Sequence, residues 1–161
     1  MSITAVKSPR FYAGPPLELD KFLAVDSQTW KAGEWAVLTS TGKAKAMAQA
    51  ETRILGIMAD SQSTATSSSN VRVYRIPSTE CKFVGYVSNG GNDTTAQRTH
   101  IGEKAGAHVA SNVLTINVGN DTKMPFKIVD CLYLKEGLKN ASTDNPGQVI
   151  FCASGDSTLQ G

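Results

Sequence analysis

The sequence contains few of the residues on which metal binding and nucleophilic catalysis most often depend. Its 161 residues include two histidines and three cysteines. The cysteines, Cys81, Cys131 and Cys152, are odd in number and widely spaced, and each has apolar residues within two positions. A disulfide framework requires paired cysteines in a secreted protein. We therefore expect three buried free thiols that pack as small hydrophobic side chains.

An excess of one charge and long apolar runs are also absent. Sixteen Lys and Arg residues against fourteen Asp and Glu leave a formal charge of +2, and both signs are mixed along the chain. This balance argues against a nucleic-acid-binding surface. No run approaches the roughly 18 apolar residues of a membrane span, and no targeting segment is visible. We expect a soluble protein, synthesised in a cytoplasm, with no membrane or direct nucleic-acid partner.

The remaining composition, with 40% hydrophobic residues, is sufficient for a folded core. Apolar and polar residues alternate in short runs, a pattern typical of β-strands. Turn residues such as Asn89-Gly90-Gly91-Asn92 separate these runs, and we find no long amphipathic helix. Gly56, inside one apolar run, predicts a bulge or a close approach of two backbones. The sequence thus predicts a mostly β fold, with an antiparallel sandwich or barrel-like core of short strands.

The first twenty residues differ from the rest of the chain in containing several residues that prevent regular backbone hydrogen bonding: Pro9, Gly14, Pro15 and Pro16. Proline favours extended backbone, so we predict an extended N-terminal arm over residues 1–20. The β-rich domain is expected over residues 21–161. It forms either one core or two lobes, 21–60 and 70–155, that a Ser/Thr-rich loop joins.

His100 and His108 are the only histidines and therefore the only candidate imidazole bases. Nucleophilic catalysis requires a serine or cysteine with a base in hydrogen-bond reach, and the sequence has no Gly-x-Ser-x-Gly elbow. A spacing of eight residues, with no acidic or cysteine cluster nearby, is also a poor metal motif. We predict no catalytic, cofactor-binding or metal-ligating residue. A β-fold hydrolase would require either histidine to approach a serine or an acid.

Three consecutive segments follow a specific order of strands and turns: Ala32-Gly33-Glu34-Trp35-Ala36-Val37-Leu38, Gly42-Lys43-Ala44-Lys45-Ala46 and Ile54-Leu55-Gly56-Ile57. This order resembles that of the small capsid decoration, or cement, proteins of tailed bacteriophages. The likeness extends over roughly residues 30–153. Further matching segments are Val71-Arg72-Val73-Tyr74, Thr94-Thr95-Ala96-Gln97 with Ile101-Gly102, and Phe126-Lys127-Ile128-Val129-Asp130.

The resemblance implies a structural virion protein without enzymatic activity or cofactor. Such a protein binds the outer surface of the phage head and stabilises it by bridging subunits of the major capsid protein. It implies a homo-oligomer, with a trimer favoured over a dimer, on the exterior of the capsid. Because aromatic and large apolar groups dominate interface energies, we predict that the contacts come from the arm: Phe11, Tyr12, Leu17 and Leu19.

An alternative is a carbohydrate-binding or host-adhesion module on a virion surface. Such a module would also be β-rich, weakly charged and non-catalytic. Glycan sites usually display exposed Trp or Tyr side chains. Trp30 and Trp35 are the only tryptophans, and Trp35 lies where we expect a core residue.

Overall fold

A computed structural model describes residues 9–48, 51, 53–62, 70–110, 113–119, 123–132 and 147–154 of the chain. Strands dominate these residues, so the predicted mostly β class is confirmed. No helix in the described ranges is long and apolar enough to cross a membrane. The elements are β1 (Arg10–Ala13), β2 (Glu18–Leu23), β3 (Trp35–Leu38), β4 (Ala44–Ala46), β5 (Ile54–Met58), β6 (Asn70–Arg75), β7 (Lys82–Asn89), β8 (Asn92–Asp93), the 3-10 helix η2 (Arg98–His100), β9 (Lys104–Ala110), β10 (Val113–Asn117), β11 (Phe126–Cys131) and β12 (Gln148–Ala153).

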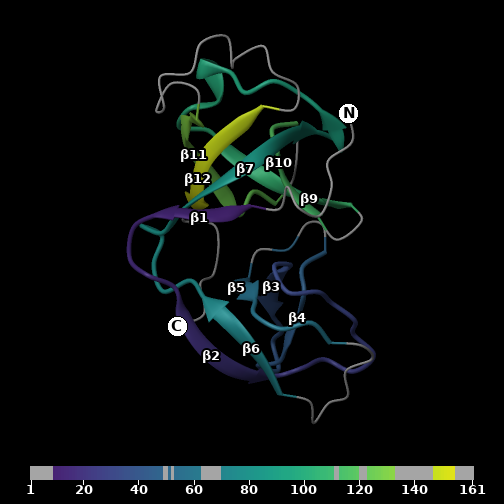
Figure 1. The fold of residues 1–161 in the computed structure, drawn as a ribbon. Coiled ribbons are helices and arrows are strands. Elements are labelled where there is room, and N and C mark those ends of the chain that lie inside the picture. Colours follow the sequence, from purple (N-terminus) through teal and green to yellow (C-terminus); the bar gives the residue numbers. More distant parts are fainter. Residues whose placement is uncertain are drawn as a thin grey trace.

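One sheet closes on itself as a five-stranded barrel (Figure 1). Its order β7–β10–β9–β11–β12 returns to β7 because β12 pairs with both β11 and β7. β10 runs parallel to β7, whereas the other barrel pairs are antiparallel. β1 and β8 pair with β7 outside this ring. The predicted barrel is therefore present, but the antiparallel sandwich is not confirmed.

A separate five-stranded sheet has the antiparallel order β2–β6–β5–β3–β4. Its outer strands approach each other where Ala24, just after β2, forms a parallel bridge with Ala44 of β4. The N–H of Val25 donates to the carbonyl of Ala44 at 3.0 Å. The curled sheet encloses a small core of its own, formed by Ala24, Trp30, Ala36, Ala44, Leu55, Met58, Val71 and Val73.

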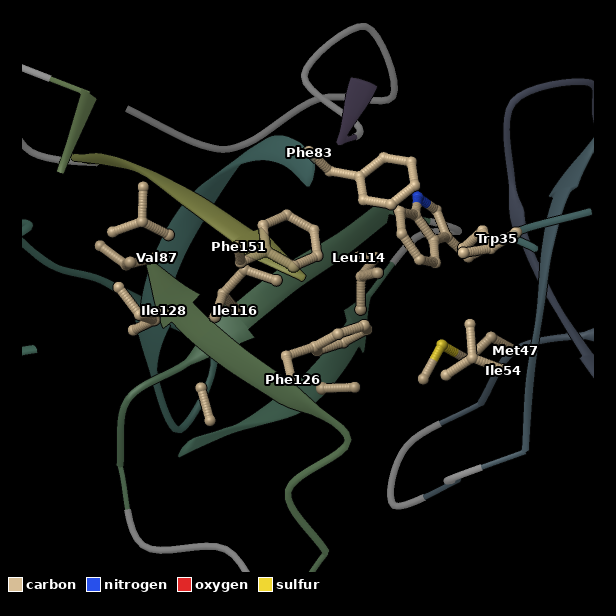
Figure 2. Close-up of a cluster of buried hydrophobic side chains, with 14 of the residues drawn as sticks. Trp35, Met47, Ile54, Phe83, Val87, Leu114, Ile116, Phe126, Ile128 and Phe151 are labelled. Carbon is tan, nitrogen blue, oxygen red and sulfur yellow. The ribbon is translucent and has the colours of Figure 1, made fainter. Parts of the chain in front are cut away.

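The sheet and the barrel also share a larger apolar core (Figure 2). Trp35 of β3 contributes to it from the sheet, and its ring centroid lies 4.9 Å from that of Phe83. The centroids of Phe126 and Phe151 lie 5.7 and 5.8 Å from Trp35. Edge-to-face and tilted ring pairs at these distances are favourable beyond the area that they bury. Trp35 therefore couples the two sheets through one aromatic cluster.

The segment predicted as an N-terminal arm enters both sheets. β1 pairs with β7 of the barrel. β2 pairs with β6 in unbroken register, from Glu18 opposite Arg75 to Leu23 opposite Asn70. The Pro15-Pro16 pair lies between the two strands, where the chain leaves one sheet and enters the other. A separate arm over residues 1–20 is thus not confirmed, and residues 1–8 lie outside the described residues.

The chain passes from the curled sheet to the barrel between β6 and β7, at residues 76–81. The sequence predicted two lobes, 21–60 and 70–155, with the boundary at the Ser/Thr-rich loop. Residues 63–69 of that loop lie outside the described residues. β6 follows that loop but pairs with β2 and β5. Strand pairing joins segments distant in sequence, so a polar loop need not mark a domain boundary.

All three cysteines are free; Cys81 and Cys131 are buried, and Cys152 is half-buried. Burial raises the pKa of each thiol. The thiol of Cys81 donates to the Pro15 carbonyl at 3.2 Å. The expectation of buried free thiols is confirmed for Cys81 and Cys131, and Cys152 is more accessible than expected.

Candidate partner-binding surface

The two histidines lie apart from any assembled catalytic pair in the described part of the chain. Nδ1 of His100 accepts the backbone N–H of Gln97 at 3.1 Å, at the start of η2. The ring of His108, on β9, covers Gly91, where an added Cβ would lie 2.6 Å from Nε2. Among the described residues, neither ring hydrogen-bonds to a serine hydroxyl or a carboxylate, and no three His, Cys, Asp or Glu side chains cluster as a metal site.

The four predicted contact residues do not form one cluster. Phe11, on β1, is 39% exposed, and its ring centroid lies 5.9 Å from that of Phe83. Tyr12 packs on Val84 and its buried neighbours outside the barrel. Leu17 packs against the shared core. Leu19 is 48% exposed on the curled sheet. Phe11 and Leu19 thus remain available to a partner, whereas Tyr12 and Leu17 are partly covered by this chain.

Leu19 belongs to an apolar row on the outer face of β2 and β6. Alternate residues of a strand lie on the same face, so Leu23 follows Leu19 on that face, and it is also exposed. Tyr74 of β6 lies opposite Leu19 in the register and is exposed as well. We call Leu19, Leu23 and Tyr74 the β2–β6 apolar row. Alternation along 18–23 indicates that Leu23 shares a face with Leu19, but only the strand pairing brings Tyr74 beside Leu19.

Ion pairs connect the strands that carry this row to each other and to the segment after β5. Arg75 of β6 lies opposite Glu18 and pairs with it across the two strands. Its Nε also donates to the carboxylate of Asp20 at 2.7 Å. Arg72 forms a two-point contact with Asp60, at 2.8 and 2.6 Å, and this hydrogen bond lowers the pKa of Asp60. By strand alternation, Glu18, Asp20 and Arg75 lie on the opposite face from the row, whereas Lys21 lies between Leu19 and Leu23 on the row's own face, opposite Arg72.

The edge of β2 adds backbone groups to this surface. In the described part of the chain, β2 pairs along its length with β6 alone, and the bridge at Ala24 follows its end. An edge strand of this kind leaves alternate N–H and C=O groups free to pair with another chain. The β2–β6 apolar row and the β2 edge therefore offer apolar contact and backbone hydrogen bonding side by side.

Glu34 is the buried acid of the described residues, and it lies at the junction of the sheet and the barrel. Burial raises the pKa of its carboxyl, and the backbone N–H and the ammonium of Lys31 partly oppose this shift. Among the residues that the structure describes, Oε1 of Glu34 and Nε1 of Trp35 find no hydrogen-bond partner. Both residues line a cavity of about 20 Å³ together with Val109 and Leu114 of the barrel. A cavity of this size holds one water molecule.

The tryptophans are core residues, at 2% exposure for Trp30 and 3% for Trp35. Neither provides the exposed platform on which the glycan-binding alternative depends. The fold is that of a mostly β protein, built from a closed barrel and a curled sheet that share one core. No protein-family model matches the sequence, and a search of curated proteins returns no match.

Proposed function

We propose that this protein is a capsid decoration protein of a tailed bacteriophage. It binds the outer surface of the head and stabilises the shell by bridging subunits of the major capsid protein. The observation that supports this function best is the β2–β6 apolar row beside an edge strand. An exposed apolar surface of this kind is typical of protein interaction sites. The order of strands and turns over residues 32–57, which resembles that of decoration proteins, also supports the proposal.

The mechanism is multivalent binding. Each copy contributes the row formed by Leu19, Leu23 and Tyr74, together with backbone pairing along β2. A homotrimer that engages several capsid subunits at once strengthens these modest contacts through effective concentration. No chemical step is required, so the function depends on a rigid surface, which the shared aromatic core provides.

The test uses heads of the phage that encodes this chain, produced without the protein and then incubated with purified variants. Leu19→Asp and Leu23→Asp each place a negative charge in the row. Each should raise the protein concentration needed for half-saturation of the heads by at least about tenfold, the effect of losing an interface hot spot. Ile101→Asp is the matched control, because Ile101 is an exposed apolar residue after η2 on the barrel side. Analytical ultracentrifugation of the same samples measures the oligomer.

If the native protein does not bind these heads, the proposed function is wrong. If it binds, but Leu19→Asp, Leu23→Asp and the Ile101→Asp control bind equally well, the capsid is contacted by another surface. Circular dichroism of each variant separates lost binding from lost folding. Substitution is preferable to deletion of residues 1–19, since such a deletion removes β1 and the start of β2 from the two sheets.

A further inference from the structure

A second surface feature, which shares no residue with the β2–β6 apolar row, lies at the β3 and β4 strands of the curled sheet. A hollow of about 330 Å³ opens where β3, β4 and β5 meet the segment that leads into β11. Small-molecule sites in proteins begin at about 300 Å³. Six of its lining residues carry polar side chains: Thr39, Ser40, Lys45, Glu51, Arg53 and Lys123.

Three cationic side chains reach this hollow from three separate segments. Lys45, on β4, lies opposite Val37 of β3. Arg53 immediately precedes β5, and its carbonyl accepts the N–H of Leu38 at 3.0 Å, which fixes its backbone. Lys123 precedes β11 on the barrel side of the junction. Because like charges repel, such a convergence is unfavourable unless an anion compensates it.

Among the described lining residues, one carries a carboxylate, Glu51, and that carboxylate is already engaged. Oε1 of Glu51 lies 2.6 Å from Nζ of Lys45. Its Oε2 accepts the N–H of Ala48 at 2.7 Å. Three cations and one carboxylate leave a formal charge of +2 among the lining residues that the structure describes. Within the described part of the chain, no salt bridge involves Arg53 or Lys123, whereas Arg72 and Arg75 of the same sheet are both paired.

We propose that this hollow, the Lys45–Arg53–Lys123 pocket, binds an oxyanion, that is, a phosphate or carboxylate group. The guanidinium of Arg53 offers parallel N–H donors that match two oxygens of such a group. The two ammonium groups add charge and further donors. Ser40 also lines the hollow, whereas the hydroxyl of Thr39 is engaged by the N–H of Lys43 at 3.1 Å and by the hydroxyl of Thr41 at 3.0 Å. The oxyanion is carried either by a small molecule or by an acidic side chain of a partner protein. This inference does not depend on capsid binding.

The test is an amide NMR titration of the full-length protein with sodium phosphate, compared with sodium chloride at equal ionic strength. Phosphate should shift the amides of Thr39, Ser40 and Arg53 in a saturable manner, while chloride should not. A second titration uses an N-acetylated, C-amidated peptide with one glutamate, compared with the same peptide containing glutamine. Phosphate binding identifies a small oxyanion ligand, and binding of the glutamate peptide alone identifies an acidic side chain.

Charge variants give expected effects of opposite sign. Arg53→Gln and Lys123→Gln should each weaken binding about tenfold, the value of a charged hydrogen bond. Glu51→Gln releases Lys45 and should tighten binding. Lys21→Gln on β2 is the matched control, since it removes one positive charge away from the pocket and should leave binding unchanged. If neither phosphate nor the glutamate peptide binds, or if Lys21→Gln weakens binding as much as Arg53→Gln, the proposal is wrong.

Discussion

Replacement of Trp35 by alanine should uncouple the curled sheet from the barrel. Trp35 is 3% exposed and contacts three aromatic rings of the barrel. A buried tryptophan removes roughly 150–250 Å² from water, which at about 25 cal/mol per Å² corresponds to about 4–6 kcal/mol as an upper value. Substitutions of buried Trp by Ala cost about 3–5 kcal/mol in practice. We therefore expect a loss of about 4 kcal/mol in the free energy of unfolding.

Urea denaturation followed by circular dichroism measures this loss, and hydrogen exchange of β7 and β5 reports on the barrel and the sheet separately. The matched control is Trp30→Ala, because Trp30 is equally buried but belongs to the core inside the curled sheet. In Trp35→Ala the two sheets should unfold in separate transitions, while Trp30→Ala should destabilise the sheet first. A loss below about 1 kcal/mol for Trp35→Ala, with a single transition retained, would refute the coupling role.

Three further substitutions test the backbone and the buried acid. Gly56→Ala should cost at least about 3 kcal/mol, because its Cβ would lie 2.0 Å from the carbonyl oxygen of Tyr74; thermal unfolding measures this cost. Gly42→Ala, with open space but a φ of +81°, should cost only about 1 kcal/mol. Glu34→Gln should stabilise the protein at neutral pH and not below pH 4.5, since the folded pKa is raised above 4.5. The native protein therefore loses stability as pH rises from 4.5 through the folded pKa. Urea denaturation at several pH values measures the free energy of unfolding of both proteins, and the difference between them should vanish at low pH.

Part of the candidate surface follows from the sequence. Leu19 was among the predicted contacts, and it is exposed on β2. Tyr12 and Leu17 were predicted with it, but both pack against buried residues of this chain. An apolar side chain near a proline-rich terminus can pack equally well against a partner protein or against the core of its own chain. The sequence therefore cannot distinguish these two fates, and the pairing of β1 and β2 decides between them.

Local features of the fold were determined by the sequence alone. Alternating runs specify strands, because successive side chains lie on opposite faces. Asn89-Gly90-Gly91-Asn92 specifies the turn between β7 and β8, where both glycines have positive φ, 59° and 91°. Gly56 was expected at a bulge or a close backbone approach, and both are present: the β3–β5 register shifts beside it, and β6 lies against it.

Only the tertiary structure decided how the strands assemble. The parallel pairing of β10 with β7, and the closure of the barrel through β12, join residues far apart in the chain. The convergence of Lys45, Arg53 and Lys123 arises in the same way, from three segments that have no common sequence pattern. Alternation specifies which residues share a strand face, but it does not specify the neighbouring strand. That choice depends on which apolar faces fit together in one core, with Trp35 at its centre.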